Sequence, residues 1–253
     1  MKHSICLAIA ALCCAVSSAA APVRLMSYNI KNANGNDGRC DIERIARVIS
    51  AQSPDVVAVQ EVDSMTARSD KHYILGEIAA LTGMHAFYAP AIDYDGGKYG
   101  IGLLSRTEPL SVRQLPLPGR EERRTLFVAD FPDYTFIGTH LSLTDDDRLA
   151  SLPVIKAVAD SCSRPVFVAG DFNDVPNSAL LRALSEDFTV VSPENEPAFP
   201  SNRPYETIDF IVMAKRVGCC VKPVRSFVVP DSVASDHRPI VVEVDFEKHK
   251  CCK

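Results

Sequence analysis

Short runs of apolar and β-branched residues alternate along the chain with polar stretches rich in turn-forming residues. Ten of these runs have the length and composition of strands: residues 23–30, 56–60, 85–89, 99–105, 126–131, 134–141, 166–169, 207–212, 224–229 and 240–246. Four segments show helical spacing of apolar residues: 41–52, 71–81, 145–159 and 178–184. Because many strands have few helices between them, the pattern predicts two packed β-sheets with helices outside, not a simple alternating parallel fold.

Local signals refine two of the predicted helices. Asp41 directly precedes the first helix and is a candidate N-cap. Pro153 interrupts the segment 145–159, so its N-terminal part is predicted to be a separate turn or a kink. The chain contains no internal repeat and no linker-like change in composition. We therefore expect residues 22–247 to form one domain and residues 248–253 to form an exposed tail.

The first 21 residues have the pattern of a secretory signal peptide. Lys2 and His3 precede an apolar run over residues 5–16, and small residues follow at 17–21. Cleavage after Ala19 or Ala20 fits this pattern best, and the run is short for a membrane span. We expect a secreted or periplasmic protein. An uncleaved anchor is the alternative, and lipoprotein export at Cys13 or Cys14 has a poor sequence context.

Charge and cysteine content limit the classes of function. The net charge is −5 and becomes −6 without the leader, which contains one base and no acid. This balance argues against bulk electrostatic binding of nucleic acid, although it does not exclude a brief contact at one local site. Three of the nine cysteines lie in the leader, and the other six show no CxxC spacing. A zinc site is therefore not expected, while disulfides and free thiols both stay open.

Polar side chains with acid–base or metal-binding capacity recur at the ends of predicted strands. They are Asn29, Glu61, His140, Asp171, Asn173, Asp209, Asp236 and His237. Each has an ordinary alternative, such as a turn residue or a solvated strand end. Asp209 is harder to explain in this way, because it lies between Ile208 and Phe210 and a buried carboxylate needs a partner. Together these groups predict a site for Mg²⁺ and a phosphate ester.

The order of the motifs SYNI, QEVD, YGIGLLSR, GTHLS, GDFNDVP, TIDFI and SDHRPI resembles that of the endonuclease/exonuclease/phosphatase superfamily. The resemblance extends from about Val23 to Phe246, and GDFN and SDHRP are its most specific parts. It implies the DNase I-like fold, an α/β (α+β) four-layered sandwich of two mixed sheets face to face with helices outside. It also implies hydrolysis of phosphodiesters or phosphomonoesters with Mg²⁺ or Mn²⁺.

The resemblance also implies roles for the strand-end residues. Glu61 matches the principal metal ligand, with Asn29 beside it and Asp236 near the metal. Asp209 matches the carboxylate that pairs with the motif histidine, His237. The remaining matches are Asp171 and Asn173, which orient the attacking water and hold the phosphate, and His140, a second histidine found in some branches of the superfamily.

The substrate is less well determined by the sequence. Arg68 and Arg106 are candidate phosphate contacts, whereas Arg124 and Arg148 are expected to be solvated surface residues. A nuclease-type phosphodiesterase is preferred over two alternatives on the same site, namely a phospholipid or sphingomyelin phosphodiesterase and a phosphatase for small phosphate esters. The phosphatase could draw its basic side chains from Lys98, Arg120, Arg123 and Arg124.

Two other classes of protein fit the sequence less well than a phosphoesterase does. A non-catalytic binding domain would be expected to lack one of Glu61, Asp171, Asp209 or His237, and all four are present. A serine hydrolase is a poor fit because the chain has no GxSxG motif. We expect the substrate to be a phosphate ester, from nucleic acid, lipid or a small molecule. We expect the protein to be a monomer without a stable protein partner.

Overall fold

The computed structural model describes residues 22–216 and 220–246. The predicted signal peptide, the predicted tail, and Cys219, Cys251 and Cys252 lie outside these residues. Cys40 is exposed and Cys162 is buried, and within the described part of the chain neither forms a disulfide. No helix of the described residues is long and apolar enough to cross a membrane.

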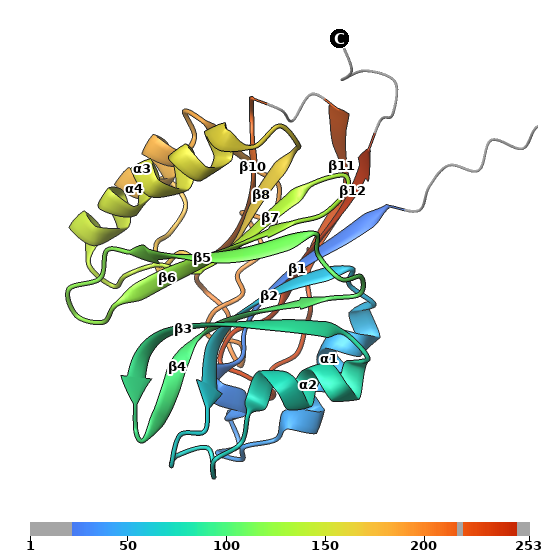
Figure 1. The fold of residues 1–253 in the computed structure, drawn as a ribbon, viewed down its shortest axis with the longest axis vertical. Coiled ribbons are helices and arrows are strands. Elements are labelled where there is room, and N and C mark those ends of the chain that lie inside the picture. Colours follow the sequence, from blue (N-terminus) through green and yellow to red (C-terminus); the bar gives the residue numbers. More distant parts are fainter. Residues whose placement is uncertain (1–21, 217–219, 247–253) are drawn as a thin grey trace, which may run out of the picture.

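Two six-stranded sheets form the centre of the fold (Figure 1). Sheet I has the order β11 (Val221–Val228), β12 (Ile240–Phe246), β1 (Val23–Asn29), β2 (Val56–Ser64), β4 (Gly97–Ser105), β3 (His85–Tyr94). Sheet II has the order β5 (Ser111–Leu117), β6 (Arg124–Asp130), β7 (Thr135–His140), β8 (Val166–Asp171), β10 (Asp209–Ala214), β9 (Phe188–Val190). Both sheets are mixed, because β1 pairs with β2 and β7 with β8 in parallel, while their other pairings are antiparallel.

The sheets face each other across an apolar core, and helices cover their outer faces. Residues such as Phe127, Phe136 and Phe167 fill the space between the sheets. The helices α1 (Ile42–Gln52) and α2 (Ile74–Thr82) pack on sheet I, and α3 (Asp145–Ser161) and α4 (Ala179–Leu184) pack on sheet II (Figure 1). The short 3₁₀ helix η1 (Lys31–Ala33) follows β1. This arrangement confirms the predicted four-layered sandwich.

All ten predicted strands and four predicted helices occur, with three differences. The sequence missed β5, an edge strand of mixed polar and apolar residues, and the three-residue β9. The predicted separate turn before Pro153 was wrong, because α3 runs through this residue as one element. Asp41 caps α1 as expected, since its carboxylate accepts a hydrogen bond from the Arg44 backbone N–H at 2.8 Å.

Gly170 is required for close packing of two strands. It lies inside β8 opposite Thr139 and Phe210, one residue beyond the end of the strand predicted over residues 166–169. A Cβ atom on Gly170 would overlap the backbone carbonyl of Thr139. We expect Gly170→Ala to lower the free energy of unfolding by roughly 1–3 kcal/mol, the usual range for overpacking, as measured by urea denaturation. An unchanged denaturation midpoint would contradict this account of the contact.

Candidate active site

Three acid–base residues lie side by side across sheet II because of strand register. His140 at the end of β7 is opposite Asp171 on the parallel strand β8. Asp209 at the start of the antiparallel strand β10 is opposite Asp171 on the other side. All three side chains are buried. These three residues are far apart in the sequence, and they meet because the strands that carry them are paired in this register. The polar residues at the strand ends had suggested this meeting.

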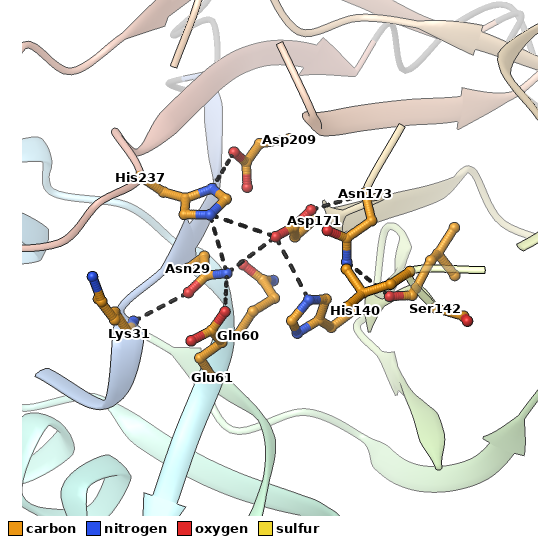
Figure 2. A network of polar contacts seen from close by, with 12 residues as sticks. Asn29, Lys31, Gln60, Glu61, His140, Ser142, Asp171, Asn173, Asp209 and His237 are labelled. Carbon is orange, nitrogen blue, oxygen red and sulfur yellow. Dashed lines mark hydrogen bonds and ion pairs between the residues drawn. The ribbon is translucent and has the colours of Figure 1, made fainter. Parts of the chain in front are cut away.

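Asp171 lies between two histidines (Figure 2). Its Oδ2 is 3.6 Å from Nε2 of His140 and 3.7 Å from Nε2 of His237. The other ring nitrogen of His237, Nδ1, is hydrogen-bonded to Oδ2 of Asp209 at 2.8 Å. The structure therefore brings together the His237–Asp209 pair that the sequence had suggested. The second ring nitrogen of His237, Nε2, faces Asp171 and also lies 3.5 Å from the amide nitrogen of Asn29.

A β-bulge turns Glu61 toward this cluster. Val59 and Val62 both pack on the helix-covered face of sheet I, and the register with β4 shifts between them. Glu61 takes a left-handed backbone conformation, with φ of 56°. Regular alternation would place Glu61 on the same face as Val59, and the extra residue in the bulge redirects its side chain.

Asn29 joins the two sheets at the site (Figure 2). Its amide nitrogen donates to Oε1 of Glu61 at 3.0 Å and to Oδ2 of Asp171 at 3.1 Å. Its Oδ1 accepts the backbone N–H of Lys31 at 3.1 Å. In this arrangement the amide nitrogen of Asn29 orients two carboxylates as a donor, and Asn29 lies beside Glu61 as the sequence predicted.

Loop residues complete the cluster. Asp236 forms an ion pair with Nζ of Lys31 at 3.0 Å and lies at the mouth of the site, with its side chain 27% exposed. Asn173 has φ of 51°, donates its side-chain amide to the carbonyl of Leu141 at 2.9 Å, and donates its backbone N–H to Oδ1 of Asp171 at 2.8 Å. Asparagine tolerates this left-handed conformation better than most residues.

The two histidines have opposite pKa shifts. Burial lowers the pKa of His140 to about 4, although the charge of Asp171 opposes this effect. Burial also disfavours charge on His237, but Asp209, Asp171 and Asp236 outweigh it and raise the pKa of His237 to about 10. Burial raises the pKa of Glu61 as well. At neutral pH, one imidazole is therefore neutral and the other is a cation, which separates their acid–base roles.

The cluster opens into a cavity of about 540 Å³ at the edge of the two sheets. Both histidines line it, and so do six carboxylates: Glu61, Glu122, Asp171, Asp174, Glu206 and Asp236. Among the described residues that line the cavity, Arg124 is the only lysine or arginine. The cavity is therefore strongly acidic.

The sequence profile described as Endonuclease/Exonuclease/phosphatase family matches residues 26–237 of this chain. The chain belongs to this family. Its members are hydrolases that act on phosphate esters. The matched segment includes every residue of the cluster from Asn29 to His237.

Solved structures of similar fold support this assignment. A family member from Beutenbergia cavernae superposes with a TM-score of 0.73 at 23% identity, covering 89% of this chain and 72% of that chain. A mannosyl-6-phosphatase of Bacteroides thetaiotaomicron gives 0.69 at 18% identity, covering 88% and 100%. The human Nocturnin catalytic domain, with bound sulfate anion, gives 0.68 at 16% identity, covering 89% and 94%. At these identities the likeness shows the fold.

The two arginines expected to contact phosphate lie elsewhere. Arg106 follows β4 at the end paired with Val56, where β2 begins, whereas Glu61 lies near the other end of β2. Its guanidinium binds Asp55 and the carbonyl of Pro54. The expectation that Arg106 contacts the phosphate is therefore not supported, because β4 runs antiparallel to β2 and carries Arg106 away from the cluster.

Arg68 lies nearer to the cavity but does not line it. Its guanidinium binds both oxygens of the buried Asp63 at 2.7 Å. It also stacks on Tyr94 and Tyr99, at 4.4 and 5.4 Å from the ring centroids. Because its charge is already paired with Asp63, Arg68 does not make the expected contact with phosphate, and it packs instead against Tyr99, which lines the cavity.

Arg124 and Arg148 were expected on the surface, and this was wrong. Both are buried, at 7% and 6% exposure. Arg148 binds Asp174, whereas Arg124 lines the cavity. The direction of the strands could have indicated the position of Arg124. This residue begins β6, which pairs antiparallel with β7, so the first residue of β6 lies beside the end of β7 that carries His140.

The cavity has donor atoms suited to a divalent cation. Glu61 and Asp236 present carboxylates to a cavity whose acidic lining needs positive charge. Asp171, Asp209 and His237 also offer ligand atoms within 4.8 Å of one another. In this trio, however, Nδ1 of His237 already binds Asp209. Since Mg²⁺ prefers oxygen ligands, Glu61 and Asp236 are the better candidates, with Asp171 within reach of the same cavity.

Proposed function

We propose that this protein is a divalent-cation-dependent hydrolase of small phosphate esters, with Mg²⁺ or Mn²⁺ as cofactor. One observation carries the proposal: a buried His–Asp pair, a second carboxylate and a bulge-directed glutamate converge on one cavity. General hydrolysis of phosphate esters is the chemistry of the family. The dependence on a metal and the size of the substrate are the parts that we propose.

His237 and Asp171 supply the acid–base chemistry. The Nδ1–H of His237 is donated to Asp209, which fixes the ring. Asn29 donates one amide hydrogen to Glu61 and the other to Asp171. It therefore has no hydrogen left to donate to Nε2 of His237, and this nitrogen can carry a proton of its own. With its pKa raised, His237 holds a proton on Nε2 and donates it toward the phosphoryl oxygens. Asp171 is placed to accept the proton of the attacking water.

The neutral histidine and the asparagine position the phosphoryl group. His140 lines the cavity beside Asp171 and is uncharged at neutral pH, so it hydrogen-bonds without adding charge. Asn173 is fixed by Asp171 and by the carbonyl of Leu141. A divalent cation held by Glu61 and Asp236 would offset the negative charge of the phosphoryl group and of the leaving oxygen.

The acidic lining favours a small ester over a polymeric nucleic acid. Binding along a nucleic-acid backbone requires lysines and arginines that neutralise successive phosphates. Two cations beside the cluster, Lys31 and Arg124, are both paired with carboxylates. A cavity of about 540 Å³ matches a small-molecule ligand. We therefore place the nuclease-type phosphodiesterase, which the sequence analysis preferred, second.

Hydrolysis of p-nitrophenyl phosphate and bis-p-nitrophenyl phosphate tests the proposal. We expect Mg²⁺-dependent turnover by residues 22–253 that EDTA abolishes. Glu61→Gln removes one negative charge from the proposed metal site. We therefore expect the Mg²⁺ concentration for half-maximal activity to rise at least about 10-fold, which is the usual loss of metal affinity when such a site is altered. A second readout, independent of activity, is the rise in Tm on adding Mg²⁺, which should shrink in the same variant.

The outcomes separate the candidates. Full activity in EDTA, or an unchanged Mg²⁺ requirement in Glu61→Gln, would refute the proposed metal site. Nicking of supercoiled plasmid at a rate comparable with that on small esters would restore the nuclease. Export to the periplasm or the medium stays a prediction from the leader sequence, and fractionation of expressing cells checks it.

A further inference from the structure

One wall of the cavity lies outside the catalytic cluster and has no part in the chemistry described so far. This wall, which we call the Glu122 wall, is formed by Tyr99 from β4, Glu122 from the segment before β6, and Arg124 at the start of β6. The three residues come from opposite sheets. They also line a small adjoining cavity of about 10 Å³, together with His140. The wall therefore borders the site at which the phosphoryl group would be held.

Arg124 fixes the carboxylate of this wall. Its Nη1 binds Glu122 at 2.9 Å, and its Nη2 lies 3.8 Å from Glu121. Its Nε is buried and has no hydrogen-bond partner in the described part of the chain. A cavity of about one water volume touches this residue, so one ordered water has room there. Glu122 keeps a 30% exposed side chain, which leaves part of its carboxylate accessible to a ligand.

The neighbouring residues hold the wall in place. Glu121 accepts hydrogen bonds from the Ser142 hydroxyl at 2.6 Å and from the Leu143 backbone N–H at 2.8 Å. Arg120 binds Asp147 on α3. These contacts tie the turn that carries Glu122 to the loop after His140. Tyr99 is held in turn by the stacked Arg68. A preorganised polar surface of this kind favours specific recognition.

The chemistry of the wall identifies its ligand. A second phosphate is disfavoured, because Glu122 is acidic and the charge of Arg124 is already paired. An apolar group is also disfavoured, because it would remove water from the exposed part of the Glu122 carboxylate and offer no hydrogen bond in its place. Neutral hydroxyl groups suit the wall, since they donate to the carboxylate and accept from the Tyr99 hydroxyl or a guanidinium N–H.

We infer that the Glu122 wall recognises hydroxyl groups on the leaving alcohol, so that the substrates are phosphate esters of polyols or sugars. This inference rests on the proposed function, because it assigns the leaving group of the same reaction. Glu122 and Tyr99 are specificity-determining residues, and neither is required to transfer a proton.

The test compares two substrates in matched variants. Wild-type protein, Glu122→Gln and Tyr99→Phe are assayed with hexose 6-phosphates and with p-nitrophenyl phosphate, which has no hydroxyl on its leaving group. We expect Glu122→Gln to lower kcat/KM for the hexose phosphates by roughly 10–100-fold, and Tyr99→Phe by a smaller factor. The loss on the aryl phosphate should be clearly smaller, so that the ratio of the two kcat/KM values changes in both variants.

A control variant and three outcomes decide the inference. Glu194→Gln makes the same change of charge at an exposed position and should alter neither activity. Equal losses on both substrates, or no loss on either, would overturn the inference, as would wild-type protein that hydrolyses aryl phosphate but no hexose phosphate. Absence of turnover on every ester would instead count against the proposed function. Aryl phosphate activity in each variant verifies that the site is folded.

Discussion

Replacing His237 by alanine is expected to lower kcat by roughly 10³-fold or more, within the upper range for loss of a positioned acid–base group. The imidazole is buried and is held by Asp209 at 2.8 Å. Its Nε2 faces Asp171 and the cavity. With the pKa of His237 raised to about 10, its imidazolium places a positive charge beside a developing phosphorane. Steady-state kinetics on p-nitrophenyl phosphate with Mg²⁺ measures the loss.

Stability has to be measured in the same variant. Removing His237 leaves Asp209 buried without its partner, and breaking a buried pair can cost about 3–5 kcal/mol. A urea titration therefore accompanies the kinetics, and activity is compared only where both proteins are folded. His85→Ala, at an exposed position on β3, is the matched control and should keep full activity. Turnover by folded His237→Ala within tenfold of wild type would refute its assigned role.

The sequence could predict which residues meet because the polar groups stand at strand ends. The run that ends at Asp171 and the run that contains Asp209 are apolar, so each acid lies at the edge of a buried sheet. Asp209 between two apolar neighbours had to have a partner, and His237 is that partner. Alternation and burial are local properties, and they can be read without knowledge of the strand order.

Features that depend on pairing could not be predicted in this way. Glu61 reaches the cavity because a bulge shifts the register between β2 and β4, and nothing in the segment QEVD marks this extra residue. The donor role of Asn29 depends on two acids, Glu61 and Asp171, that come from different sheets. The directions of β4 and β6 decide that Arg106 is remote and that Arg124 lines the cavity. Each of these outcomes is a property of the assembled sheets.

Replacing Asp171 by asparagine is expected to have an effect of similar size, a loss in kcat of roughly 10³-fold. The carboxylate accepts hydrogen bonds from Asn29 and Asn173 and faces His140 and His237. An asparagine has one acceptor oxygen instead of two and cannot accept the proton of water. Steady-state kinetics on p-nitrophenyl phosphate measures this loss. Asp174→Asn is not a suitable control, because Asp174 also lines the cavity. Asp133→Asn, in the exposed turn after β6, serves instead.

The same variant should also change the titration of both histidines. The charge of Asp171 raises the pKa of His140 and of His237, so both pKa values should fall in Asp171→Asn. NMR titration in EDTA measures this shift without interference from a metal. Because the pKa of His237 is raised on folding, its protonation stabilises the protein below its unfolded pKa, and that stabilisation is lost as the pH rises toward 10. The loss with rising pH should be smaller in Asp171→Asn.

Combining the two substitutions distinguishes one catalytic unit from two separate contributions. If Asp171 and His237 act as one unit in the attack of water on the same phosphoryl group, the double variant should lose little more activity than either single variant. If they act independently, the losses multiply to roughly 10⁶-fold. The distance of 3.7 Å between Oδ2 of Asp171 and Nε2 of His237 favours the first result. Multiplying losses in folded proteins would show that the two side chains serve different steps.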